Sequence, residues 1–500
     1  MRLLRTTALA LVAAACTLIG AGTTGPQLVA AQGCRVLERQ ELRSMPIQRL
    51  TAFFRAVQAL QARPRPNVFD WYAFTHNQFR VQAHGNAQFL AWHRIFIRSF
   101  EYQLQLIDPD VALPYWDWSI DSQAPETSWV LSRTWFGGNG RSGDNCVVDG
   151  QFANFRIYYP QQRCLQRQFN LGNRLGAFYS PEALLAIANR ATDYATFNAW
   201  TEAPPHNIVH SNIAGDMDTM YSPNDPLFFV HHSFVDRQWA QWQARSQQNL
   251  WSYNGRNSDG SNAQLTDMLQ PFNTRARDVM DTRNLCYTYT GVIQRTIAAP
   301  ASAPNTPSAA TGNPSATASA TNTPTTGLRR RAVGRYTSTA AVDARRRTRS
   351  SRLPDQGDRS DLNAIRACKP IPEENIRMNF LDRNLVRSLE AMLGEVAAQV
   401  NSARGYVSPS ALISRPQTLA ALGRSQNEMA LSRSRTVIPI DVPKAQDGSV
   451  RVDALVNNAA ASLGVLDATQ QQNATASVAN LVGSEGARVL RSDYGVSVVP

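Results

Sequence analysis

Apolar side chains recur with the spacing of a helical face in three segments of this chain. In the first segment they stand at Leu50, Phe53, Phe54, Val57 and Leu60. Segments 88–105 and 226–243 repeat the pattern, and each places a histidine among its apolar positions. Loops punctuated by proline and glycine separate the three segments. The pattern therefore predicts a mainly α-helical core, a bundle of helices joined by long loops.

Composition divides the chain into parts. All ten tryptophans and all seven histidines lie within residues 71–251, inside an aromatic-rich stretch at 34–295 that can bury a core. Residues 296–360 consist largely of Pro, Ala, Ser, Thr and Arg, which predicts a low-complexity linker. Residues 361–500 are weakly apolar with some helical pattern, and we expect a weakly structured C-terminal extension there.

The N-terminus has the features of a secretory signal peptide. Arg2 and Arg5 precede an apolar run at 8–19, and small residues follow it. A membrane anchor is the alternative, but this run and every later one fall short of the ~18 apolar residues that a spanning helix needs. We expect removal of residues 1–31 and a secreted product without a membrane partner.

Charge excludes one class of partner. The formal net charge is +12, but residues 296–360 hold ten Arg against three Asp, so the excess is concentrated in the linker. A basic spacer explains this distribution better than a nucleic-acid-binding face does. We therefore expect no nucleic-acid partner.

Five cysteines remain beyond the signal peptide, and export makes disulfides permissible. Cys146 and Cys164 flank one short insertion and are expected to pair. Cys34 with Cys286 would tie the two ends of the core together, which leaves Cys368 without a partner.

The histidines are confined to two windows, 76–93 and 206–232. Imidazole is a common ligand of Cu, Zn, Fe and Ni, and neither window contains a cysteine or an obvious carboxylate ligand. His206 and His210 are four residues apart, which places both on one face of a helix. The windows therefore predict metal binding.

His231 and His232 are neighbours, so on a helix they point about 100° apart and do not serve one ion comfortably. We select His232, because Asp236 lies four residues later on the same face and can accept a hydrogen bond from the second ring nitrogen. Two sites with three histidines each then remain. Such all-imidazole sites favour a pair of copper ions over zinc, whose paired sites normally share carboxylate or water bridges.

Longer motifs carry a family resemblance. FTHNQFRVQAHGNAQFLAWHRIFIRSFE resembles the first copper motif of the tyrosinase family of type 3 copper proteins, and PPHNIVHSNIAGDM with SPNDPLFFVHHSFVDRQW resembles the second. LPYWDW and CYTY are also similar to family motifs. The resemblance covers residues 34–295 and implies a four-helix bundle holding two coppers. The implied ligands are His76, His84 and His93 for one copper, and His206, His210 and His232 for the other.

The resemblance implies a phenol oxidase that uses O2 to hydroxylate monophenols and to oxidise o-diphenols to o-quinones. A catechol oxidase without monophenol activity and an oxygen carrier like hemocyanin are the alternatives. Glu202 and Asn207 stand where the family holds a water for deprotonating a monophenol, although Glu202 could instead stabilise a helix N-terminus. Met220 or Tyr221 is expected to gate the pocket or to pack in the core.

Members of the family are often latent, with a C-terminal extension that covers the copper pocket until proteolysis. The resemblance implies this role for residues 361–500. The clusters Arg329–Arg331 and Arg345–Arg347 are then the candidate cleavage points.

Overall fold

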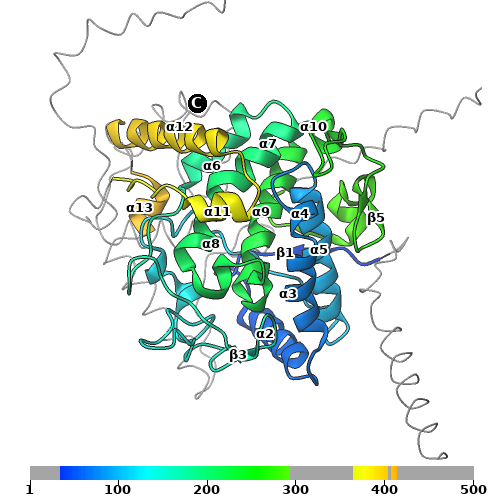
Figure 1. Cartoon of the computed structure of the whole chain (residues 1–500), viewed down its shortest axis with the longest axis vertical. Helices are drawn as coiled ribbons and strands as arrows, with labels where there is room; N and C mark the ends of the chain where they lie inside the picture. Colours follow the sequence, from blue (N-terminus) through cyan, green and yellow to red (C-terminus); the bar gives the residue numbers. More distant parts are fainter. Residues whose placement is uncertain (1–33, 293–363, 404–406, 414–500) are drawn as a thin grey trace, which may run out of the picture. The chain divides into compact units, whose positions relative to one another are not determined.

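The computed structural model describes residues 34–292, 364–403 and 407–413 (Figure 1). All three ranges belong to the same one of the chain's two structural units. The predicted signal peptide, the linker with its arginine clusters, and the remainder of the extension lie outside the described residues.

Helices form most of the regular structure, as predicted. Those of the N-terminal part are α2 (Ile47–Gln61), α3 (Val68–Gln78), α4 (Arg80–Ala83), α5 (Phe89–Gln105), α6 (Pro181–Arg190), α7 (Tyr194–Thr201), α8 (Asn207–Ile213), α9 (Leu227–Ala244) and α10 (Gln247–Trp251). A π-helical turn, Glu202–His206, joins α7 to α8. The finer expectation of a four-helix bundle stays a prediction.

The local sequence explains which face of a helix is buried and where a helix begins. The five apolar residues of α2 named above are all buried, which confirms the predicted face. The side chain of Asn67 accepts hydrogen bonds from the backbone N–H groups of Phe69 and Asp70, and the Asp70 carboxylate accepts one from Asn67 in return. This capping box fixes the start of α3, the helix that carries His76.

Helices α5 and α9 pack directly against each other in the core. The rings of Phe100 and Phe229 stack at 3.5 Å between centroids, with an interplanar angle of 11°. The packing of α5 on α9 also sets the rings of His93 and His232 face to face, with 4.4 Å between their centroids. Packing between these two apolar helices therefore brings the two histidine windows together.

Short strand pairs tie distant parts of the chain. β1 (Leu37–Arg39) pairs in parallel with β6 (Tyr287–Tyr289), and the Cys34–Cys286 disulfide lies beside this pair. β2 (Arg156–Ile157) pairs antiparallel with β3 (Arg163–Cys164), and Cys164 is bonded to Cys146. β4 (Met268–Leu269) pairs with β5 (Thr274–Arg275). Both predicted disulfides are confirmed, and Cys368 is the remaining free cysteine among the described residues.

Part of the C-terminal extension is well structured. Its described residues, 364–403 and 407–413, are called the C-terminal segment below; they form α11 (Glu373–Met378), α12 (Arg383–Ser402) and α13 (Pro409–Ile413). The expectation of weak structure is wrong here because α12 has a narrow apolar stripe that the core buries. The stripe consists of Val386, Leu389, Leu393, Val396 and Val400. Helix α12 packs on α6, as Figure 1 shows. Across the described ranges, no helix combines the length and apolarity needed to cross a membrane.

Candidate metal centre

The structure brings the three histidines of the first window together. His76 lies on α3, His93 lies on α5, and His84 directly follows α4. All three are buried, and one ring nitrogen from each lies within 4.8 Å of the other two. The Nε2 atoms of His76 and His93 are 3.3 Å apart.

Backbone carbonyls orient these rings. The Nδ1 atoms of His76, His84 and His93 lie 2.8, 3.2 and 2.9 Å from the carbonyl oxygens of Met220, Arg80 and Phe89. A carbonyl only accepts, so each Nδ1 carries the proton and donates it. The lone pair of each neutral ring is then on Nε2, where a metal ion could be bound.

The second window forms an adjoining cluster. The π-helical turn ends at His206, α8 carries His210, and α9 carries His232. The Nε2 atom of His232 lies 3.2 Å from Nε2 of His206 and 3.4 Å from Nε2 of His210. The Nδ1 atom of His210 donates to the carbonyl of Met217 at 2.6 Å. Three nitrogens thus converge here as they do in the first group.

His231 also belongs to this second cluster, with a ring nitrogen within 4.8 Å of the others. Its ring lies parallel to that of His206, at 14° and 5.1 Å. Both of its nitrogens are buried without a hydrogen-bond partner in the described part of the chain. Both neighbours therefore have a nitrogen near His206 and His210, and the choice of His232 over His231 as the third ligand stays a prediction.

The reason given for choosing His232 is wrong. The Asp236 carboxylate accepts from Arg94 Nε at 2.5 Å and from the Tyr287 and Tyr289 hydroxyls at 2.6 and 2.7 Å. His232 Nδ1 is buried and has no partner among the described residues. Two buried arginines and two tyrosines hold Asp236 away from the imidazole, so Asp236 does not orient that ring.

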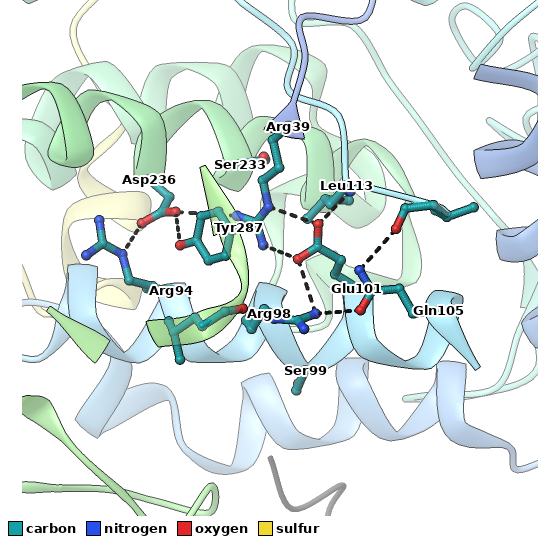
Figure 2. A network of polar contacts seen from close by, with 12 residues as sticks. Arg39, Arg94, Arg98, Ser99, Glu101, Gln105, Leu113, Ser233, Asp236 and Tyr287 are labelled. Carbon is teal, nitrogen blue, oxygen red and sulfur yellow. Dashed lines mark hydrogen bonds and ion pairs between the residues drawn. The ribbon is translucent and has the colours of Figure 1, made fainter. Parts of the chain in front are cut away.

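Figure 2 shows the polar network to which Asp236 belongs. Arg39 on β1 donates to both oxygens of Glu101, at 3.1 and 2.8 Å, and it lies 3.4 Å from Asp236. Burial would raise the pKa of Glu101, but Arg39 and Arg98 hold it below its ordinary value. Sequence reasoning missed this network. It joins β1 and β6 to α5 and α9, so it holds the two histidine-bearing helices in place.

Burial controls the charge of the histidines. It lowers the pKa of His76 to about 3 and that of His210 to about 4, and it lowers those of the other histidines well below the ordinary value. The rings are therefore neutral at neutral pH, which is the state that binds a metal ion. Neutral imidazoles with converging nitrogens fit copper.

In the sequence, Glu202 precedes His206 by four residues and Asn207 directly follows it. Glu202 is 1% exposed, its Oε1 accepts the Gly85 N–H at 2.9 Å, and burial raises its pKa well above the ordinary value. The Asn207 Nδ2 donates to the backbone carbonyls of Glu202 and Ala203 at 2.7 and 3.2 Å. The water predicted between these two side chains stays a prediction.

The two gate candidates differ in position. Met220 is buried, and its backbone carbonyl orients His76. Tyr221 is half-buried, and its hydroxyl accepts from Asn77 Nδ2 at 3.1 Å. Of the two, only Met220 lines the pocket over the histidines.

That pocket is nearly closed by the C-terminal segment. Its volume is about 10 Å³, enough for about one water. Met378, Asn375 and Asn379 from α11 and its end line it together with His76, His84, His206, Asn207, His210, Met217, Thr219, Met220 and Ser222. Asn375 also donates to the Asp218 carboxylate. These three residues of the C-terminal segment belong to no motif that could have been recognised in the sequence.

Comparisons with known proteins bear on this site. A family model described as the common central domain of tyrosinase matches residues 66–245, which include all the histidines. A tyrosinase of Streptomyces antibioticus is 36% identical over 217 residues, covering 38% of this chain and 78% of that protein. Tyrosinase ustQ of Aspergillus flavus is 34% identical over 284 residues, covering 50% and 78%. A mutant polyphenol oxidase from Thermothelomyces thermophila aligns with a TM-score of 0.42 at 24% identity, covering 51% of this chain and 88% of that one.

Proposed function

Because this chain belongs to the tyrosinase family and is thereby a copper oxidase acting on phenols, we propose that it hydroxylates monophenols and oxidises o-diphenols to o-quinones. One observation supports a two-metal site above the others. Two clusters of buried, neutral histidines, with converging nitrogens in each, adjoin through the stacked rings of His93 and His232 at 4.4 Å.

The proposed ligands divide by cluster. His76, His84 and His93 would hold one copper ion, and His206, His210 and His232 the other. When bound, the copper pair supplies the activation of O2. Imidazole suits copper, and no carboxylate belongs to either histidine cluster in the described ranges.

The remaining residues would handle substrate and proton. A small phenol would enter over His76 and His210, between Met220 and Asn207. Phe228, stacked on His232 at 4.1 Å, keeps that ligand's ring in place. Glu202 is the proposed base: its carboxylate would take the phenol hydroxyl proton through a water beside Asn207.

We further propose that the C-terminal segment is a removable cover and that the protein is secreted in a latent form. A pocket of about 10 Å³ cannot admit a phenol ring. The residues that fill it belong to α11, which follows the arginine-rich linker in sequence. Two disulfides suit an oxidising compartment.

The test uses the copper-loaded full chain, assayed before and after limited digestion with an arginine-directed protease. A monophenol and an o-diphenol are compared in the wild type and in Glu202→Gln. We expect both activities to appear after digestion, and Glu202→Gln to lower monophenol turnover selectively. Turnover of the diphenol alone would make the protein a catechol oxidase, and reversible O2 binding without turnover would make it a carrier.

A further inference from the structure

A second cavity lies beside the metal pocket. Its volume is about 240 Å³, far more than that of the pocket over the histidines. One wall is the loop at Gly85, another is a face of α7, and a third comes from the start of α12. Its lining includes Gly85, Ala195, Ala199, Glu202, Leu381 and Leu385.

Glu202 faces this cavity. Ala195, Asn198, Ala199 and Glu202 all line it, and their spacing of three and four residues defines one helical face. Gly85, whose N–H donates to the Glu202 carboxylate, lines it as well. The metal pocket adjoins these residues: Asn207, which lines that pocket, donates to the backbone carbonyl of Glu202 at 2.7 Å, and Gly85 directly follows His84.

A buried base must release the proton that it accepts, and it needs a route to solvent other than the metal pocket. A phenol bound over the histidines would fill the metal pocket and block solvent on that side. At a liquid share of ~30 Å³ per water, the second cavity has room for several water molecules. Asn86, Asn198 and Asp382 offer polar groups along its wall. Ala195 and Ala199 are partly exposed, which places the mouth of the cavity at the protein surface.

We propose that this cavity holds a water path through which the Glu202 carboxyl exchanges its proton with bulk solvent without crossing the metal pocket. The inference rests on the proposed role of Glu202 as base. The phenol O–H bond breaks and an O–H bond forms on Glu202. Glu202 then passes that proton to cavity water, and an equivalent proton leaves at the mouth, so no oxidant or reductant is needed.

The C-terminal segment forms part of the wall of this path. Leu381 and Leu385 line the cavity, and the Phe380 carbonyl packs on Gly85 so closely that a Cβ at Gly85 would lie 2.4 Å from that oxygen. Removal of the segment would therefore open the water path as well as the metal pocket.

The experiment follows hydrogen–deuterium exchange at the Glu202 carboxyl in the copper-loaded full chain. Burial raises the pKa of Glu202. Spectra recorded below that pKa show the infrared C=O band of the protonated carboxyl, which Glu202→Gln identifies by its loss. Ala199→Leu places a larger apolar side chain in the cavity and should slow the shift of this band in D2O at least tenfold. Thr196→Leu adds the same side chain to α7 away from the cavity and should leave the rate unchanged.

Ala195→Leu, which also changes the wall of the cavity, replaces Ala199→Leu in the test if circular dichroism shows that Ala199→Leu does not fold. A wild-type exchange rate in the folded cavity-filling variants would overturn the proposal, and so would equal slowing in Thr196→Leu. The assay of Glu202→Gln on monophenol tests the base separately. Slowed exchange with full monophenol turnover in Glu202→Gln would keep the water path and reject the base.

Discussion

The hydroxyl of Tyr287 donates a 2.6 Å hydrogen bond to the Asp236 carboxylate, joining β6 to the helix that carries His232. Arg94 donates to the other carboxylate oxygen from α5. One buried carboxylate thus connects the end of the N-terminal part to both helices at the junction of the histidine clusters. These hydrogen bonds affect the metal site indirectly, by fixing the positions of α5 and α9.

Asp236→Asn should destabilise the protein strongly. It leaves the buried Arg94 without its carboxylate partner, which costs about 3–5 kcal/mol, whereas Arg39 keeps both of its hydrogen bonds to Glu101. Tyr287→Phe removes one hydrogen bond and should cost only about 1–2 kcal/mol. Urea unfolding of the two variants measures both values. Copper content should stay at two equivalents in Tyr287→Phe, and a loss there would mean that this network contributes directly to metal binding.

Sequence patterns predicted several features of the fold. The helical spacing placed the buried face of α2 correctly, and the cysteine positions predicted both disulfides, one of which joins residues 252 positions apart. The error at Asp236 has a physical cause. Spacing of four residues shows which side chains can meet on one helix, but Arg39 and Tyr287 lie 197 and 51 residues from Asp236. These distant residues bind the Asp236 carboxylate in the folded chain, in place of the nearby imidazole of His232.

The assignment of His232 over His231 predicts a difference in metal content. His232→Ala should reduce copper from two equivalents to one, because its Nε2 converges with those of His206 and His210. His231→Ala should keep both equivalents, since that ring packs parallel to His206. Elemental analysis of the purified variants decides between them. The reverse result would make His231 the ligand.

The buried histidines predict acid sensitivity of the metal-free protein. Their pKa values are lowered in the folded state, to about 3 for His76 and about 4 for His210, against about 6.5 when unfolded. Below pH ~6.5 the unfolded chain therefore binds more protons, and the free energy of unfolding should fall as pH drops from 6.5 toward 4. Urea unfolding at pH 7, 6 and 5 follows the loss.

His231→Phe supplies the control for this pH dependence. Burial lowers the pKa of His231 well below its ordinary value, and the ring is not a proposed ligand. Its removal should reduce the slope between pH 6.5 and 5 by about one proton, or ~1.4 kcal/mol per pH unit. An unchanged slope would show that groups other than the buried histidines set the acid sensitivity.

The covering role of the C-terminal segment predicts activation without proteolysis. Leu389 of α12 is 2% exposed and packs in a cluster with Ala203, Ile371, Ile376 and Val386. A charged side chain in this cluster is costly to bury, so Leu389→Asp should detach the segment and carry α11 away from the metal pocket. Phenol oxidase activity of the undigested, copper-loaded variant should then approach that of the digested wild type.

Ala391→Asp is the matched control, because Ala391 is exposed on the same helix and the added charge stays in water. It should remain as inactive as the undigested wild type. Thermal unfolding and copper content identify a folded, loaded Leu389→Asp protein before the assay. If that protein stays inactive until digestion, α12 does not hold the cover in place, and Met378 and Asn375 must be kept over the histidines by other contacts, such as the one between Asn375 and Asp218.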